Sequence, residues 1–69
     1  MRKLILRDHR GHVEMDLDTQ EAIQELERAM NAGMLAVKTD ADGVSEQITN
    51  PAETQDVQEV RAFWPLAGG

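Results

Sequence analysis

The last residues of the chain are the ones whose types and spacing suggest chemistry. The sequence ends in Pro65, Leu66, Ala67, Gly68 and Gly69. A C-terminal carboxylate has a pKa of about 3.5, so it is ionised at neutral pH and is a poor electrophile. It can receive sulfur or form an amide only after activation, for example by adenylation with ATP. The group in this tail at which such chemistry would take place is the Gly69 carboxylate.

The residue types in this tail suit insertion into a narrow channel of an activating enzyme. Four extended residues span about 13 Å, at about 3.3 Å each, so the carboxylate can enter a nucleotide pocket while the folded body stays outside. Gly68 and Gly69 have no Cβ atoms that would block the channel or the approach of a nucleophile. Leu66 provides an apolar anchor at the channel mouth, and Pro65 stiffens the exit from the last strand. We expect the partner enzyme to use the ATP, with no cofactor bound by this chain.

Two strands and a turn are predicted at the N-terminus. The segment Lys3 to Asp8 contains a short apolar run, which is typical of a strand buried on at least one face. A turn that includes Gly11 follows it. Val13, Met15 and Leu17 then alternate with acidic residues, which indicates a half-exposed strand with an acidic outer face. Together these segments predict a hairpin.

One amphipathic helix of about 14 residues is predicted after the hairpin. Asp18 or Thr19 can cap its start, and Glu21 stands three residues after Asp18, as in a variant of the capping box. Gly33 stands where a helix-terminating glycine is expected. Such a helix can cover one face of a sheet with its apolar stripe. The residues of the stripe are Ala22, Ile23, Leu26, Ala29 and Met30.

Three further strands are predicted in the second half of the chain, with a hairpin turn at Asp42-Gly43 between the first two. Asn50-Pro51 ends the second of them, and the polar stretch Ala52 to Asp56 is expected to be a loop. The three strands are Met34 to Lys38, Val44 to Ile48 and Val57 to Trp64.

This element order predicts an α+β domain over residues 1–65. We expect a mixed sheet of four to five strands with the amphipathic helix packed across one face. The first and last strands are expected to lie side by side at the centre of the sheet, which is the β-grasp arrangement. Residues 66–69 are expected to form a flexible tail.

The last eleven residues, EVRAFWPLAGG, resemble the C-terminus of the small sulfur-carrier subunit of molybdopterin synthase. That family ends in an acidic residue, a hydrophobic strand with paired aromatics, a proline, an aliphatic residue, a small residue and Gly-Gly. Trp64 stands where the family often has a second proline. With its element order, the chain also resembles the wider ubiquitin-like superfamily, which includes the thiamine sulfur carrier and ubiquitin-like protein modifiers. The corresponding positions here are Glu59, Val60, Phe63, Pro65, Leu66, Ala67, Gly68 and Gly69.

The resemblance implies a carrier that is the substrate of an enzyme and is not itself an enzyme. In this superfamily an E1-like adenylating enzyme converts the C-terminal glycine into an acyl-adenylate, a role that the resemblance implies for Gly69 with Gly68 as its neighbour. The next product is the thiocarboxylate of a sulfur carrier, or the thioester and isopeptide of a protein modifier. The further partners implied are a sulfur-accepting synthase subunit in the first case and an E2-like enzyme or an isopeptidase in the second. Both alternatives stay open.

Phe63 and Trp64 are adjacent, so on a strand they point to opposite faces of the sheet. We expect one of them to fill the core and the other to be exposed beside the tail, unless both lie against the sheet edge. With Pro65 and Leu66, an exposed aromatic side chain would form the surface on which the activating enzyme docks.

The composition excludes several classes of function. The chain has no cysteine, which excludes disulfides, thiolate metal sites and a cysteine nucleophile, and a reducing, cytoplasmic setting is expected. Thirteen acidic residues against seven basic ones give a net charge of −6, which argues against nucleic acid or an anionic membrane as partner. His9 and His12 flank a turn near Asp8, but they lack a third firm ligand, so no metal site is expected.

A second interpretation belongs to a different class of protein. A small acidic β-grasp domain can act as a protein-interaction module whose tail has no chemistry. Deletion of Gly68 and Gly69 would leave such a module unaffected.

Overall fold

The computed structural model describes residues 2–8, 11–55 and 57–65. Within these residues the chain forms five strands, one α-helix and one 3-10 helix. In chain order they are β1 (Lys3–Asp8), β2 (Gly11–Asp16), α1 (Gln20–Asn31), β3 (Leu35–Thr39), β4 (Ser45–Ile48), the 3-10 helix η1 (Pro51–Thr54) and β5 (Glu59–Phe63).

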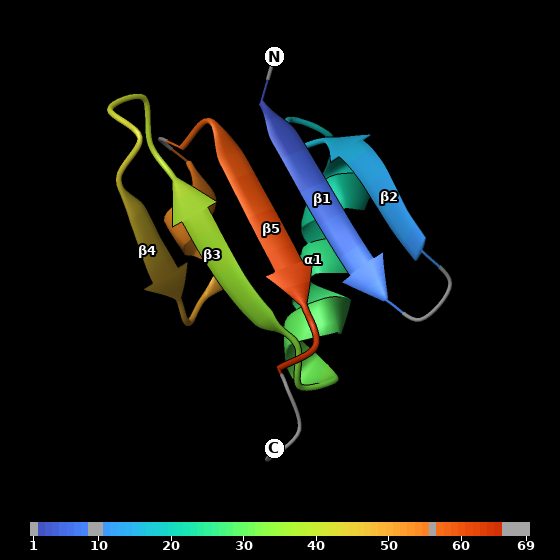
Figure 1. The fold of residues 1–69 in the computed structure, drawn as a ribbon. Helices are drawn as coiled ribbons and strands as arrows, with labels where there is room; N and C mark the ends of the chain where they lie inside the picture. Colours follow the sequence, from blue (N-terminus) through green and yellow to red (C-terminus); the bar gives the residue numbers. More distant parts are fainter. Residues whose placement is uncertain (1, 9–10, 56, 66–69) are drawn as a thin grey trace.

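The strands form a single mixed sheet in the order β2-β1-β5-β3-β4 (Figure 1). β1 and β5 pair in parallel at its centre, whereas all other neighbouring strands pair antiparallel. The last strand is thus inserted between two hairpins, β1-β2 and β3-β4. This arrangement confirms the predicted α+β class, the mixed sheet and the central position of the first and last strands.

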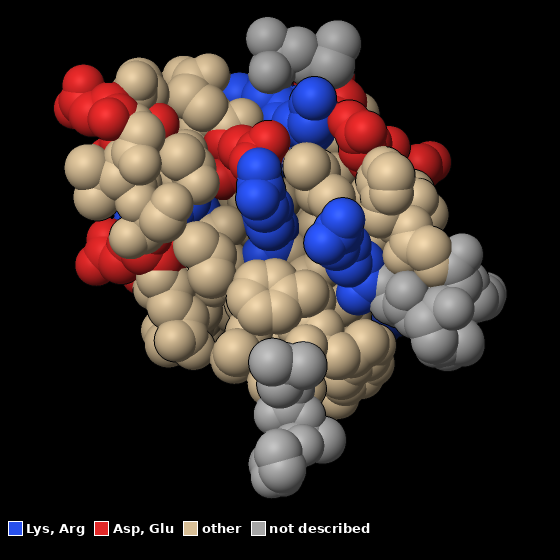
Figure 2. Space-filling view, in the orientation of Figure 1, with Lys and Arg blue, Asp and Glu red and all other residues tan. Residues whose placement is uncertain are grey.

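The two faces of the sheet differ because successive side chains of a strand point to opposite sides. α1 covers one face, and we call the other the open face. The cross-strand registers align two neighbouring rows of side chains on the open face, which is viewed in Figure 2. The first row is Glu14, Ile5, Arg61 and Val37, and the second is His12, Arg7, Phe63 and Leu35.

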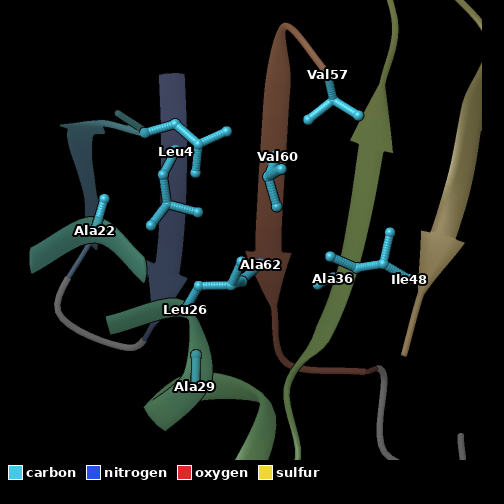
Figure 3. Close-up of a cluster of buried hydrophobic side chains, with 10 residues drawn as sticks. Leu4, Ala22, Leu26, Ala29, Ala36, Ile48, Val57, Val60 and Ala62 are labelled. Carbon is cyan, nitrogen blue, oxygen red and sulfur yellow. The ribbon is translucent and has the colours of Figure 1, made fainter. Parts of the chain in front are cut away.

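The core lies between the sheet and α1 (Figure 3). Leu4 of β1 and Val60 of β5 are aligned in the parallel pair, and both are fully buried. Leu26 of α1 is also fully buried and packs in the same cluster. The predicted helical stripe is confirmed, because its members are either buried or packed against this core. The buried apolar residues are Leu4, Leu17, Ala22, Leu26, Ala29, Ala36, Ile48, Val57, Val60 and Ala62.

The start of α1 is capped by Thr19, one of the two predicted candidates. The Thr19 Oγ1 accepts a hydrogen bond from the backbone N–H of Ala22 at 3.2 Å, which satisfies one of the free donors of the first turn. Asp18 pairs instead with Arg2, whose Nε donates to the Asp18 Oδ1 at 2.7 Å. The helix has 12 residues rather than about 14, because Thr19 and Ala32 are the caps that flank it and are not part of it.

The end of α1 is a Schellman motif, as the predicted role of Gly33 requires. Gly33 has a φ of 106°, in the region that favours glycine. Its N–H donates to the Met30 carbonyl at 3.1 Å, and the Met34 N–H donates to the Ala29 carbonyl at 3.0 Å. This turn directs the chain into β3, at the end of the sheet where β5 finishes.

The segment predicted as a loop contains η1, so that prediction is wrong. The Asn50 side chain accepts from the backbone N–H of Ala52 at 2.9 Å, and the Glu53 Oε2 accepts from the backbone N–H of Asn50 at 2.9 Å. These contacts form a capping box, and Pro51 stands at the helix start, where its missing N–H costs nothing. The signal for η1 in the sequence was the three-residue spacing of the capping residues Asn50 and Glu53, and not a periodic pattern of apolar residues.

Arg2 fastens the end of η1 to the segment before α1. Its Nη1 donates to the carbonyl oxygens of Thr54 and Gln55, and its Nη2 lies 2.6 Å from the Asp18 Oδ1. Backbone bonds continue this connection, because the Lys3 N–H donates to the Gln58 carbonyl at 3.0 Å. The chain that enters β5 is therefore held in place before the strand begins at Glu59, two residues later than predicted.

Acid should loosen the capping box of η1. Hydrogen bonds from the backbone N–H groups of Thr49 and Asn50 hold the pKa of Glu53 below its ordinary value of 4.5, with the Thr49 bond the larger cause. A carboxyl group with a lowered folded-state pKa contributes stability that is present above the unfolded pKa and is lost as the pH falls through the folded pKa. We therefore expect the urea concentration at the unfolding midpoint to decrease when the pH is lowered below about 4.5. This decrease should be smaller in Glu53→Gln.

The matched control is Glu27→Gln, on the exposed side of α1. Urea unfolding at pH 7 and pH 3 measures both variants. A pH dependence in Glu53→Gln equal to that of the unmodified chain would contradict the assignment of this effect to the capping box.

Candidate docking surface beside the C-terminal segment

The predicted tail follows the central strand of the sheet. β5 ends at Phe63, and Trp64 and Pro65 are the last residues that the structure describes. Leu66, Gly68 and Gly69, the predicted anchor and activated terminus, lie outside the described residues. The described part of the candidate site is therefore the surface around Phe63, Trp64 and Pro65.

Phe63 and Trp64 both reach the surface of the protein, and neither fills the core. Phe63 is aligned with Arg7 of β1 and Leu35 of β3, so it lies on the open face, where it is half-buried. Trp64 is 47% exposed, and its Cζ3 is 3.7 Å from the position that a Cβ on Gly33 would occupy. The expectation that one aromatic residue fills the core is thus wrong.

The reason is the alternation of side chains in β5. Val60 and Ala62 point towards α1, so Phe63 must point the other way. Trp64 follows the end of the strand and packs beside the turn between α1 and β3. Of the two aromatic residues, Trp64 is the more exposed, and it has the surface position that the docking prediction requires.

Phe63 and Trp64 line a groove on the open face with a volume of about 610 Å³. Ile5 adds a third apolar side chain, and Arg7, His12 and Arg61 supply polar ones. Figure 2 shows Lys and Arg side chains gathered at the middle of this face, above an uncharged area. We call this groove the arginine groove.

A cross-strand contact with Lys3 neutralises the carboxylate of Glu14, an acidic residue in the lining of the arginine groove, and His12 of the same strand lies beside it. The Glu14 Oε1 lies 3.2 Å from the Lys3 Nζ, and its Oε2 lies 3.6 Å from the His12 Nε2. The pKa of Glu14 is lowered, mainly by its hydrogen bond to Lys3, so this carboxylate is ionised at neutral pH. Its charge is already matched by the Lys3 ammonium group.

Arg61 also has an acidic neighbour, but the contact uses only one of its nitrogens. The Arg61 Nε donates to the Glu59 Oε2 at 2.8 Å. A guanidinium has five N–H groups, of which four are on the two terminal nitrogens. In the described part of the chain these four donate to no protein acceptor, so they are available to a partner.

A second groove, of about 690 Å³, lies between α1 and η1. Arg2 and Asp18 line it, and they bind each other and the carbonyls at the end of η1. Its polar groups therefore have a structural role, and the groove does not include the residues before the tail. The arginine groove is the better candidate for function.

The described residues contain neither a cluster of metal ligands nor a helix that could span a membrane. No group of three or more His, Asp or Glu side chains there could hold a metal ion. His9 and the side chain of Asp8 lie outside this description. No helix in the described ranges has both the length and the apolar character that a bilayer span requires.

The sequence patterns predicted the aromatic side of this surface but missed Ile5, Arg7 and Arg61. Ile5, Arg7 and Arg61 each stand an even number of residues from another residue on the open face of the same strand. This spacing was the signal in the sequence that could have found them. The spacing within each strand predicts the groove only when β1 is known to pair with β5, because residues from opposite ends of the chain form the groove.

No protein-family model, curated protein or solved structure matches this chain. The resemblance of its last eleven residues to sulfur-carrier subunits therefore remains a prediction.

Proposed function

We propose that this protein is a ubiquitin-like carrier of the β-grasp fold, and that an ATP-dependent, E1-like enzyme adenylates its Gly69 carboxylate. The main support is the parallel pairing of β1 with β5 at the centre of a five-stranded sheet crossed by one helix. This arrangement is compatible with the β-grasp fold, and it makes a central strand the base of the Gly-Gly segment.

A central strand is a rigid base for a reactive tail. β5 is paired with β1 on one side and β3 on the other, and its Val60 and Ala62 are buried. The proposed chemistry requires the four residues after Pro65 to be extended when the carboxylate enters a channel. Fixing four backbones costs about 1–2 kcal/mol per residue, so the enzyme needs contacts beyond the tail. The exposed Trp64 and the half-buried Phe63 supply a surface for them.

The chemistry at Gly69 follows from the properties of a carboxylate. One carboxylate oxygen attacks the α-phosphorus of ATP, and pyrophosphate leaves. A sulfur nucleophile then attacks the acyl carbon of the adenylate, and AMP leaves. The product is a thiocarboxylate when the nucleophile is hydrosulfide, or a thioester when the nucleophile is an enzyme thiolate. A lysine amine can convert the thioester into an amide with release of the thiol.

The sulfur carrier and the protein modifier are two outcomes of the same adenylate. A sulfur carrier passes its thiocarboxylate sulfur to a synthase subunit, whereas a modifier passes its acyl group to lysines through an E2-like enzyme. Both proposals share the activating enzyme and the docking surface, and they differ only after AMP has left.

Mass spectrometry of the protein and its adducts, recovered from the native host without reductant, tests the proposal. Replacement of one terminal oxygen by sulfur would establish the sulfur carrier. Gly69 in amide linkage to lysines of other proteins would establish the modifier. A terminus that stays unmodified, and unreactive with ATP and host lysate, would refute both and leave the interaction module.

A further inference from the structure

The charge of the arginine groove is opposite to that of the chain as a whole. The net charge is −6, from thirteen acidic and seven basic residues. Yet two of the five arginines line this one groove, together with His12. The carboxylate of Glu14, which also lines the groove, is matched by Lys3, and Arg61 uses only its Nε in the ion pair with Glu59. A partner surface that approaches this groove therefore meets positive charge on an otherwise acidic protein.

Apolar and cationic side chains are interleaved across the groove by the parallel register. Arg61 of β5 is aligned with Ile5 of β1, and Arg7 of β1 is aligned with Phe63 of β5. The two guanidinium groups are therefore diagonal neighbours on the same face, each beside an apolar side chain. Trp64 extends the apolar part towards the end of the sheet.

This combination matches one kind of partner. We propose that the arginine groove binds a protein segment in which acidic residues flank an apolar side chain. The carboxylates pair with Arg7 and Arg61, because guanidinium groups bind carboxylates through two parallel hydrogen bonds. The apolar side chain packs on Ile5, Phe63 and Trp64.

Nucleic acid is the less suitable occupant of the same groove. Phosphate groups also bind arginine, but the affinity of nucleic acid depends on many such contacts along the backbone. The acidic residues of this chain oppose that approach, whereas a short acidic segment meets only the local positive charge. The apolar floor also favours an aliphatic or aromatic side chain.

This inference goes beyond the proposed carrier function and does not require activation of Gly69. The binding depends on the folded body, so it can be measured without ATP or an activating enzyme. A failure of the binding test would leave the tail chemistry standing, and the absence of tail chemistry would leave the binding site standing.

Peptide selection on the full chain tests the proposal without knowledge of the natural partner. A phage-displayed library of random dodecapeptides is selected on the immobilised protein, and the enriched peptides are synthesised. We expect Asp and Glu on both sides of a Leu, Ile or aromatic residue. Binding should change the fluorescence of Trp64, which is the only tryptophan of the chain and lines the groove.

Charge-reversal variants then locate the site. Arg7→Glu and Arg61→Glu should each raise the dissociation constant of a selected peptide at least about tenfold. The matched control is Arg28→Glu on α1, which pairs with Glu25 far from the groove and should leave the affinity unchanged. Circular dichroism verifies that each variant is folded.

A charge exchange separates binding from misfolding. Arg61→Glu should bind a peptide whose acidic residues are replaced by lysine more tightly than the unmodified chain binds it, which an unfolded variant cannot do. Three results would overturn the proposal: no enrichment over a blank surface, selected peptides that bind all variants equally, or a single-stranded oligonucleotide that binds as tightly as the best peptide.

Discussion

Deletion of Gly68 and Gly69 should abolish every covalent adduct at the C-terminus and leave the fold unchanged. The proposed chemistry needs a terminal carboxylate on a residue without a side chain, at the end of a segment long enough to reach a nucleotide pocket. The shortened chain ends in Ala67, and its carboxylate lies about 7 Å further back. We expect adduct formation in host lysate with ATP to fall below detection by mass spectrometry.

The urea midpoint of the shortened chain should equal that of the full chain, because among the residues that the structure describes, up to Pro65, the core contains none after Ala62. Ala67→Gly is the matched control, since it alters the same segment but keeps the terminal Gly-Gly, and it should still form the adduct. Equal adduct formation by the shortened chain would contradict the proposed role of Gly69.

Leu4→Ala should unfold a large fraction of the protein. Leu4 is fully buried on the central strand β1, aligned with Val60 and in the same cluster as Leu26. Truncation of a buried leucine to alanine costs about 2–5 kcal/mol. A domain of 69 residues has a free energy of unfolding of about 3–10 kcal/mol. The expected loss is therefore a large part of the whole, and the urea midpoint should fall sharply.

Val44→Ala is the matched control for this truncation. Val44 lies in the turn before β4 and is 60% exposed, so its truncation should leave the urea midpoint nearly unchanged. Equal effects of the two substitutions would show that the core does not depend on the packing between β1, β5 and α1.

Local patterns in the sequence were sufficient to predict most of the elements. The alternation around Met15, the apolar stripe of α1 and the glycine at position 33 each depend on neighbouring residues. The stripe and the glycine are confirmed, and the alternation is confirmed as a strand, although its Val13 is 57% exposed and Leu17 follows the end of β2. η1 was missed because its signal is the pair Asn50 and Glu53, which contains no hydrophobic residue.

The surface was harder to predict than the elements. The side of the sheet on which Phe63 lies depends on whether the even-numbered or the odd-numbered residues of β5 face α1, and the predicted strand was too long at both ends. The arginine groove depends on the register between β1 and β5, which are far apart in the sequence. Such long-range pairing leaves no local pattern in a single sequence.

The parallel pairing of β1 and β5 also has a mechanical consequence. β1 begins near the N-terminus, and β5 runs beside it in the same direction towards the C-terminal segment (Figure 1). A force that pulls these two ends apart acts along the strands and loads all hydrogen bonds of the pair in shear at the same time. They cannot open one after another, as they would if the force acted across them. We therefore expect the folded domain to resist a force that is applied between its N-terminus and its C-terminal segment.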